Sequence, residues 1–587
     1  MNWDLTYHFK NQEEFEKAFE ETKAVVAKFS EFQGKLGIES EFVKYCLLMK
    51  KFEEDASRVY QYASLKSDLN KKDVENAAAL NRCMMVFYSL SEVTAFVEPE
   101  ILSVGEEKIM SFIDNNKEIE EFRFSTEKLF RGAKHILDGN SERLLSLYSP
   151  VTNSASELYS ALAVGDGKGV DVKLKNKTVV TVTQGNYRSL IASSDNASDR
   201  KKIFEAVFKT FEEHKTTYAT IYNNALQKNK AQAKARNYEG VLESYLYRNN
   251  IPTSVFLNLI DVAGNNNKSL KKYLKLRKQA LGLKQYHTYD RFLELAHSNK
   301  RYTYEEAKDL FFKAIEKFPE DFQNKAHEVL REGFVDVNEK VGKRTGAYSS
   351  SVANSHPFIL LNYDSTLDSV FTVAHEAGHS IHSMYSAEAQ PTMLQDYTIF
   401  VAEIASTFNE HVLLDYFLES SDATRDEKIM VIQKAIDNIF GTFYRQTLFA
   451  EYEYLANEKV KEGHPINHQV LSGIMVDLYK KYYGLDIEKE GVKKYVWAYI
   501  PHLFYTPFYV YQYATSFAAS FKIYKDIKTN VEGAFERYIN LLKSGGSKYP
   551  VDQAKDAGVD FTKKDAYMAV VERMDDLVNQ LEKLLNE

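Results

Sequence analysis

Residues 356–379 contain the two runs on which the predicted fold is built: His356-Pro357-Phe358-Ile359-Leu360-Leu361-Asn362-Tyr363 and, nine residues later, Val373-Ala374-His375-Glu376-Ala377-Gly378-His379. The first run is short and apolar and follows the loop-like stretch 344–351, so it is typical of a strand. Helical patterning resumes in the second run and continues to Glu587. The sequence therefore predicts a small sheet directly before a long helix.

The second run carries a pattern suited to metal binding. On a helix, His375 and His379 are four residues apart, so both imidazoles project from one face. This separation suits two ligands of one tetrahedral Zn²⁺. Glu376 lies beside the first histidine and can reach a metal-bound water without binding the metal, which is the position of a general base. The alternative for this string alone is a helix with two partly buried histidines and a solvated glutamate.

A zinc site needs a third protein ligand. A third histidine six residues after His379 is excluded, because that position is Tyr385. Glu403 is a lone acid among apolar residues, where an unpaired carboxylate would be costly unless it met a cation or a hydrogen-bond donor. Glu410, seven residues further on, lies on the same helix face and could hold a ligand histidine in its tautomer. A surface acid is the alternative for Glu410.

Donors to an oxyanion are expected from the segment 499–513, which contains one histidine, several tyrosines and two prolines. Its histidine is His502. Spacing does not determine which tyrosine faces a site, and core packing accounts for most of them individually.

The rest of the chain is predicted to be mainly helical. The 587 residues include 25 Gly and 10 Pro, about 4% and 2% against usual values of about 7% and 5%. Because glycine and proline interrupt helices, their low content indicates long uninterrupted helices. The exception is a Gly-rich stretch, 164–169, followed by alternating valines with Asn176-Lys177 between two β-type runs, which predicts a hairpin near 170–184.

Composition excludes several classes of protein. With 75 Lys and Arg against 83 Asp and Glu, the net charge is −8, and no basic block is long enough to track phosphates, so no nucleic-acid partner is expected. No apolar run approaches the roughly 18 residues of a transmembrane helix, and the first residues lack the regions of a signal peptide. We expect a soluble cytoplasmic protein without a membrane partner. Cys46 and Cys83 have no ligand partners at metal spacing and are expected to be buried thiols.

Together these motifs resemble oligoendopeptidase F, a bacterial branch of the thimet-oligopeptidase-like zinc metallopeptidases. The resemblance rests on the His-Glu-x-x-His string, on Glu403 within Glu-Ile-Ala-Ser-Thr, and on the segment 502–513. It covers essentially the whole chain, and further matching stretches are Asn2-Trp3-Asp4-Leu5, the run 356–363, Ser544-Gly545-Gly546-Ser547-Lys548-Tyr549-Pro550 and Ala557-Gly558-Val559-Asp560.

The resemblance implies a single bound zinc ion with His375, His379 and Glu403 as its ligands. Glu376 would be the general base, which later passes a proton to the leaving amine. Mn²⁺ and Co²⁺ remain alternatives to Zn²⁺, because availability in the cell selects the metal as much as the ligands do.

The resemblance also assigns roles in the segment 499–513. His502 would match the family's transition-state histidine, assisted by Tyr505 and Tyr513. Because the spacing departs by about one residue from the thimet branch, Tyr509 and Tyr511 are alternatives to these tyrosines.

The family fold implies two helical halves around a deep substrate channel with zinc at its floor, and a small β-sheet beside the zinc-binding helix. Such a channel would admit an unfolded peptide and exclude a folded protein. We expect an N-terminal helical domain over residues 1–195, with the hairpin near its end, and a catalytic zinc metallopeptidase domain over residues 196–587. Gly346-Ala347-Tyr348 resembles the family's loop near the substrate backbone, and the strand Phe358–Tyr363 could pair with an extended peptide.

The function expected from these features is that of a zinc-dependent endopeptidase that cuts internal bonds of short, unfolded peptides in the cytoplasm by attack of a metal-activated water. One alternative is a dipeptidyl carboxypeptidase, which shares the metal chemistry. The other is a non-catalytic peptide-binding protein on the same helical body. The sequence does not indicate the oligomeric state or the cleavage-site preference.

Overall fold

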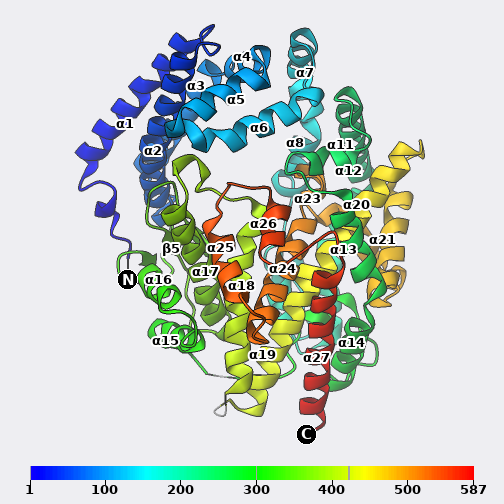
Figure 1. Ribbon diagram of the computed structural model, residues 1–587. Helices are drawn as coiled ribbons and strands as arrows, with labels where there is room; N and C mark the ends of the chain where they lie inside the picture. Colours follow the sequence, from blue (N-terminus) through cyan, green and yellow to red (C-terminus); the bar gives the residue numbers. More distant parts are fainter. Residues whose placement is uncertain (1, 299, 421–422) are drawn as a thin grey trace. The chain divides into compact units, whose positions relative to one another are not determined.

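The computed structural model describes residues 2–298, 300–420 and 423–587 (Figure 1). Helices make up 71% of the chain, and the described residues contain two small sheets, so the predicted mainly α class is confirmed. The chain forms two compact units, each assembled from three segments. Unit 1 contains residues 1–134, 300–416 and 523–559, and unit 2 contains residues 135–299, 417–522 and 560–587.

Each unit is discontinuous in sequence, whereas the expected N-terminal and catalytic domains, 1–195 and 196–587, are continuous. That division of the chain into two domains stays a prediction. The substrate channel expected from the family fold also stays a prediction.

Unit 1 is mainly helical, and some of its helices begin at a polar side chain that caps the first turn. The Asn11 side chain accepts a hydrogen bond from the backbone N–H of Glu14 at the start of α1, and Thr366 accepts one from Ser369 at the start of α17. The helices that begin in this unit are α1 (Gln12–Val26), α2 (Glu39–Leu69), α3 (Val74–Val93), α4 (Val97–Val104), α5 (Glu106–Asn115), α6 (Arg123–Gly132), α15 (Tyr304–Ala314), α16 (Glu320–Val329), α17 (Leu367–Ala389), α18 (Ile399–Glu419), α25 (Ala534–Lys543) and α26 (Pro550–Asp556).

A three-stranded sheet in unit 1 has the order β3 (Val335–Asp336), β5 (Phe358–Leu360), β4 (Tyr348–Ser350). β5 runs parallel to β3 and antiparallel to β4. All three residues of β5 are buried, and the Trp3 indole donates a hydrogen bond of 2.8 Å to the carbonyl of Ile359. The sheet packs against α17, which confirms the small sheet predicted beside the helix that carries His375 and His379.

The strand order corrects one expectation. β5 was expected to pair with an extended peptide, but it is the central strand and its backbone groups already bond to β3 and β4. The strand next to the Gly346-Ala347-Tyr348 loop, β4, lies at the edge of the sheet instead. An added strand would therefore have to pair with β4.

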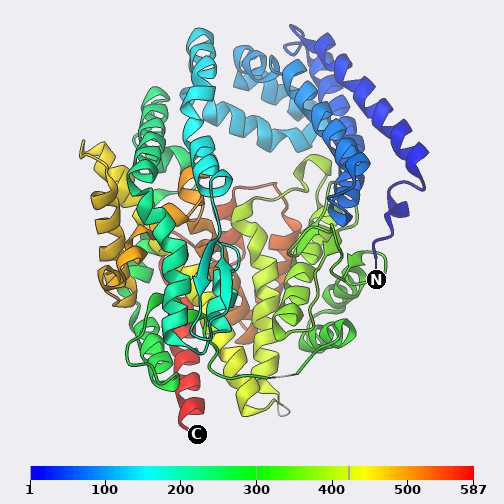
Figure 2. The same ribbon diagram turned by 180° about the vertical axis from the view of Figure 1, so that it is seen from behind.

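Unit 2 contains the predicted hairpin, which is confirmed: β1 (Val170–Lys173) pairs antiparallel with β2 (Val179–Val182) (Figure 2). The helices that begin in this unit are α7 (Gly139–Thr152), α8 (Ser154–Ser160), α9 (Tyr187–Ala192), α10 (Ala197–Glu213), α11 (Lys215–Ala235), α12 (Val241–Tyr247), α13 (Thr253–Asn265), α14 (Lys268–Ala280), α19 (Arg425–Asn438), α20 (Arg445–Lys461), α21 (His468–Tyr483), α22 (Val496–Tyr499), α23 (His502–Tyr505), α24 (Tyr511–Lys528) and α27 (Asp565–Asn586).

Two further expectations concern the cysteines, expected to be buried thiols, and the absence of a membrane-spanning helix. Cys46 and Cys83 are buried and unpaired, as predicted. Among the described helices, none combines the length and the apolar character needed to cross a bilayer.

Candidate metal centre

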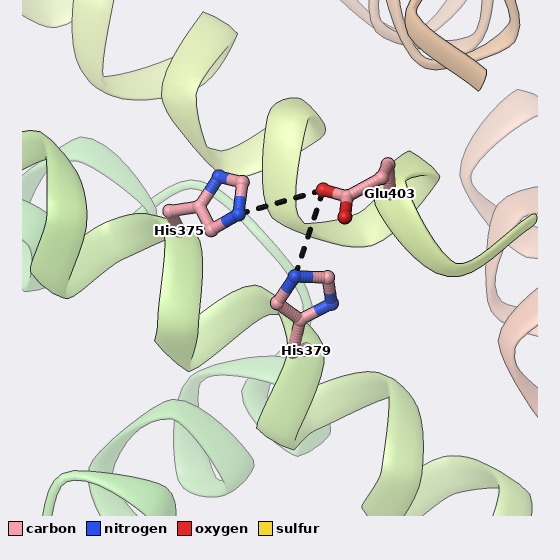
Figure 3. Close-up of side chains that lie close together, drawn as sticks. All are labelled: His375, His379 and Glu403. Atoms are coloured by element: carbon pink, nitrogen blue, oxygen red, sulfur yellow. Dashed lines mark ion pairs between the residues drawn. The ribbon is translucent and has the colours of Figure 1, made fainter. Parts of the chain in front are cut away.

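Two neighbouring helices of unit 1 bring together three side chains that could hold a metal ion. His375 and His379 lie on α17, and Glu403 lies on α18 (Figure 3). The Nε2 atoms of His375 and His379 lie 3.5 Å and 3.6 Å from Oε2 of Glu403. One ligand atom from each of the three side chains lies within 4.8 Å of the other two. The predicted ligand set is thus assembled at one point.

The spacing fits one small metal ion. Two ligand atoms about 2.1 Å from a tetrahedral ion lie about 3.4 Å apart, close to both of these N–O distances. Two imidazole nitrogens and one carboxylate oxygen are also a donor set that Zn²⁺ uses in catalytic sites, where one position stays open. Within the described part of the chain, no other group of three His, Cys, Asp or Glu side chains meets this spacing.

Gly378 allows the two helices to approach this closely. A Cβ atom at this position would lie 2.5 Å from the carbonyl oxygen of Ala405 and 2.6 Å from Cα of Ser406, both on α18. Such distances are far inside van der Waals contact, so only glycine fits between the helices. The glycine therefore lets Glu403 reach the two histidines.

Glu410 holds one of the histidines in place. Its Oε1 atom lies 2.6 Å from Nδ1 of His375, which leaves Nε2 directed toward Glu403. A carboxylate bonded to the other ring nitrogen sets the tautomer and orientation of a metal-binding histidine. The orienting contact expected for Glu410 is present. The next residue back, Asn409, also ties α18 to α17 by donating to the carbonyl of Ala374 at 3.2 Å.

Glu376 is placed beside the cluster as a buried, reactive carboxylate. The residue is only 6% exposed, and its Oε2 atom has no hydrogen-bond partner in the part of the chain that the structure describes. Burial raises the pKa of Glu376 to about 7, although the nearby His375 lowers it and Glu403 raises it further. A proton acceptor with a pKa near neutrality suits a general base.

The loop before β4 is anchored by a partner distant in sequence. The Tyr348 hydroxyl donates to Oδ2 of Asp68 on α2 at 2.6 Å, and Arg344 pairs with the same carboxylate at 3.1 Å. The Ser349 hydroxyl lies 2.8 Å from that of Ser380 on α17. Asp68 could not be found from the sequence, because nothing local links residues 280 positions apart.

His502, in unit 2, forms a cluster with two tyrosine rings. Its ring lies parallel to that of Tyr509, with centroids 5.8 Å apart, and edge-on to that of Tyr513 at 6.4 Å. The Tyr509 and Tyr513 centroids are 5.5 Å apart. Burial and the positive charge of Arg445 lower the pKa of His502, which favours its neutral form at neutral pH.

The other two candidate tyrosines pack against aromatic rings of other helices. Tyr505 is 42% exposed, and its ring packs edge-on against Tyr159 at 5.4 Å. Tyr511 is buried and its ring contacts Phe256 at 5.4 Å. Of the alternatives left open by the sequence, the structure therefore groups Tyr509 and Tyr513 with the histidine, and the catalytic role of Tyr505 stays a prediction.

Comparison with known proteins assigns the chain to a known family. The model of peptidase family M3 matches residues 190–572, and a model described as oligopeptidase F matches residues 100–168. The chain belongs to peptidase family M3.

Several relatives that match over nearly the whole chain are named oligopeptidase F or oligoendopeptidase F. Oligopeptidase PepF of Bacillus subtilis is 34% identical over 588 residues, which cover 99% of this chain and 87% of the relative. The crystal structure of oligoendopeptidase-F from Enterococcus faecium matches with a TM-score of 0.76 at 27% identity, over 98% of this chain and 99% of that chain. A candidate peptidase from Chlamydophila abortus matches with a TM-score of 0.90 at 30% identity, over 99% and 98% of the two chains. The resemblance to oligoendopeptidase F and the prediction of a metalloendopeptidase of this family are confirmed.

Proposed function

We propose that this chain is a zinc-dependent endopeptidase that hydrolyses internal bonds of short, unfolded oligopeptides in the cytoplasm. The observation that carries the proposal is the convergence of His375, His379 and Glu403 beside Glu376, whose buried oxygen has no partner among the described residues. The F-type relatives support an endopeptidase rather than a dipeptidyl carboxypeptidase.

The catalytic roles follow from the chemistry of these side chains. Zn²⁺, when bound, supplies a Lewis acid that polarises a carbonyl and makes a water molecule more acidic. Glu376 takes the proton from the attacking water and later delivers it to the leaving amine, for which a pKa near 7 is well suited. Glu410 holds the His375 ring through its Nδ1 atom and so preserves the position of Nε2.

Substrate binding in this proposal uses the edge strand β4. An extended peptide can add to a free strand edge through backbone hydrogen bonds, which do not depend on the peptide's side chains. Ser349 of β4 lies close to Glu376, because the backbone of Ser349 lowers the pKa of that carboxyl against the effect of burial. A peptide on β4 would thus pass close to the general base.

The oxyanion that forms on attack needs hydrogen-bond donors. We assign this role to His502 with Tyr513, and to Tyr509 as the ring stacked on His502. Tyr505 is retained as a further candidate. Replacing each tyrosine in turn by phenylalanine shows which of them acts in catalysis. Removing a hydroxyl that stabilises the oxyanion should lower kcat by about 10²–10³. Removing the hydroxyl of a tyrosine that only packs should leave kcat unchanged.

The first test is cleavage of an internally quenched peptide of about ten residues by the purified full chain. A chelator should abolish cleavage, and added Zn²⁺ should restore it; Mn²⁺ and Co²⁺ are tested in parallel. Cleavage that survives complete metal removal would contradict the proposal. A C-terminally amidated peptide is then cut internally by an endopeptidase, while a dipeptidyl carboxypeptidase should stall on it.

The role of Glu376 is tested by Glu376→Gln. We expect kcat/KM to fall by about three orders of magnitude or more, because the amide cannot accept the proton, while bound zinc per chain stays unchanged. Glu388→Gln, an exposed acid near the end of the same helix, is the matched control and should keep full activity. If Glu376→Gln keeps its activity, Glu376 is not the base. If the natural zinc-loaded chain binds peptides without cutting any, the peptide-binding alternative replaces the proposal.

A further inference from the structure

A cavity of about 60 Å³ inside unit 2 is lined by an unusual group of charges. Four of its lining side chains are cationic, and we call the space they enclose the cation cavity: Arg188, Arg291, Arg445 and Lys493. All four belong to unit 2, so none of them is shared with the metal-ligand set of unit 1.

The four cations come from four separate elements. Arg188 lies on α9, Arg291 in the 3₁₀ turn η6 (Thr288–Phe292), Arg445 at the first position of α20, and Lys493 in η9 (Ile487–Tyr495). Sequence neighbours cannot account for such convergence, so the fold itself gathers like charges that repel one another.

None of these four charges forms an ion pair with a carboxylate of the described residues. Among the described residues, none of the four cations has a carboxylate oxygen within 4.0 Å, the limit for an ion pair. Two acids close in sequence to these cations, Asp290 beside Arg291 and Glu490 three residues before Lys493, have other partners. Glu490 accepts hydrogen bonds from the N–H and the hydroxyl of Thr288 at 2.8 Å and 2.6 Å. Asp290 pairs with Arg200 at 3.3 Å.

Aromatic rings support the cations without neutralising them. The Arg291 guanidinium lies 4.5 Å from the ring centroid of Phe440, and the Lys493 ammonium lies 4.6 Å from that of Phe208. A cation–π contact of this kind contributes attraction but leaves the net positive charge in place. The cavity therefore keeps a positive field that an anion could satisfy.

Two hydroxyl groups in the lining also have no partner in the described structure. Tyr286 and Tyr483 are 9% and 4% exposed, and their phenolic oxygens make no hydrogen bond among the described residues. A buried hydroxyl without a partner costs free energy. Both can donate to an acceptor placed in the cavity.

The lowered pKa of Lys493 is consistent with a site that an anion would stabilise. Burial and the positive charge of Arg445 lower the pKa of Lys493 to about 7, with Arg291 and Arg188 acting in the same direction and Glu490 opposing them. An anion between these side chains would remove the repulsion.

We propose that the cation cavity is a binding site for one doubly charged oxyanion of the phosphate class. Its volume of about 60 Å³ would hold about four to six water molecules, at 10–15 Å³ each, or the four oxygens of one tetrahedral ion. Guanidinium groups suit such oxygens because they donate two parallel hydrogen bonds. A monocarboxylate has only two oxygens, half as many as phosphate, and a single negative charge to set against the four cations. Arg188 is an exposed residue of the lining, so this side of the cavity lies at the protein surface.

The test measures binding of inorganic phosphate to the full chain by isothermal titration calorimetry and by thermal unfolding. We expect one ion per chain and a rise in Tm with phosphate concentration. Lys493→Met and Arg291→Met should weaken phosphate binding by about 10- to 100-fold, the effect of losing a charged hydrogen bond. Both variants should also unfold at a higher temperature than the natural chain in phosphate-free buffer, because they remove repulsion. A merely structural role for these side chains would give the opposite shift.

Lys494→Met is the matched control, since it removes the same charge one residue outside the lining. It should leave phosphate binding unchanged. Glycerol phosphate in place of phosphate distinguishes a free ion from a phosphoryl group carried on a small molecule. The proposal is overturned if the natural chain binds no phosphate, if Lys493→Met binds it as well as the natural chain does, if Lys494→Met loses it equally, or if succinate binds more tightly than phosphate.

Discussion

At the scale of single residues, the proposed metal centre depends on a side chain that is not itself one of the three proposed ligands. Glu410 bonds to Nδ1 of His375 at 2.6 Å and so orients the ligand nitrogen on the opposite side of the ring. Loss of such a partner commonly weakens metal binding by about 10- to 100-fold. We expect Glu410→Ala to lower zinc affinity within that range, measured by competition with a chromophoric chelator.

Glu410→Gln is the graded control for that change. The amide oxygen can still accept a hydrogen bond from the imidazole, so its affinity for zinc should lie between those of the natural chain and Glu410→Ala. Equal affinities for all three chains would show that the His375 ring is held by packing alone.

A second residue, Glu453 on α20, should make stability depend on pH. Its Oε1 atom accepts a hydrogen bond of 2.8 Å from the backbone N–H of Phe508, and burial raises the pKa of Glu453 to about 8 from an ordinary 4.5. Between these pH values the folded chain keeps a proton that the unfolded chain loses. The free energy of unfolding therefore falls as pH rises from about 5 to 8.

Glu453→Gln removes this titration and keeps an acceptor for Phe508. The Tm of the variant relative to the natural chain should rise steadily from about pH 5 to about pH 8. Glu458→Gln, on the same helix and paired with Lys461 at 3.6 Å, should follow the pH trend of the natural chain. A Tm difference for Glu453→Gln that is constant with pH would refute the assignment.

At the scale of elements, the contact between α17 and α18 depends on Gly378. A methyl group there would meet the backbone of α18 at 2.5 Å, so Gly378→Ala must push the helices apart. Overpacking of this kind costs about 1–3 kcal/mol. We expect a lower Tm and, because Glu403 moves away from the histidines, weaker zinc binding.

Gly473→Ala tests whether the effect is specific to that contact. Gly473 lies inside α21, and no neighbouring atom lies within 4 Å of the position that a methyl group would take there. Alanine at this position should therefore stabilise the chain by about 0.5–1 kcal/mol. If the two variants change Tm in the same direction, the close approach at Gly378 is not what limits the helix spacing.

Much of the metal centre could be predicted from sequence because its rules are local. The helical period places His375 and His379 on one face, and an acid among apolar residues marks Glu403 as needing a partner. The sequence shows that Gly378 is a glycine inside a predicted helix. Its role in the close approach of α17 and α18 cannot be predicted, because that role depends on a second helix. The order of strands could not be predicted either, because β5 acquires its second neighbour from Val335–Asp336, far from the runs that formed the prediction.

The tyrosines after His502 show a different limit. Tyr505, Tyr509, Tyr511 and Tyr513 are similar in spacing, and their directions depend on the turn between α23 and α24. Phe508 adopts a positive φ of 52° in that turn, a conformation rare for a bulky side chain. The hydrogen bond from its backbone N–H to the buried Glu453 helps to hold this turn. Local sequence patterns do not predict a partner so distant in the chain.

At the scale of the whole molecule, the three proposed metal ligands all belong to unit 1. A ligand that binds only the folded state stabilises it by about 4 kcal/mol at a thousandfold excess over Kd. We expect removal of zinc to accelerate amide hydrogen exchange in α17 and α18, while α14 and α27 of unit 2, which pack together, keep their protection. Equal acceleration in both units would mean that they unfold as one.

The chain crosses between the two units after residues 134, 299, 416, 522 and 559, and this has a consequence for biogenesis. A ribosome delivers α17 and α18 long before α25, the helix of unit 1 that packs on α17. Neither unit can fold completely during translation before its last segment has been synthesised. Its apolar surfaces therefore stay exposed to solvent until the segments that cover them have been translated. We therefore expect stalled chains ending before residue 534 to depend on chaperones and to be cut readily by proteases, whereas the released full-length chain should resist them.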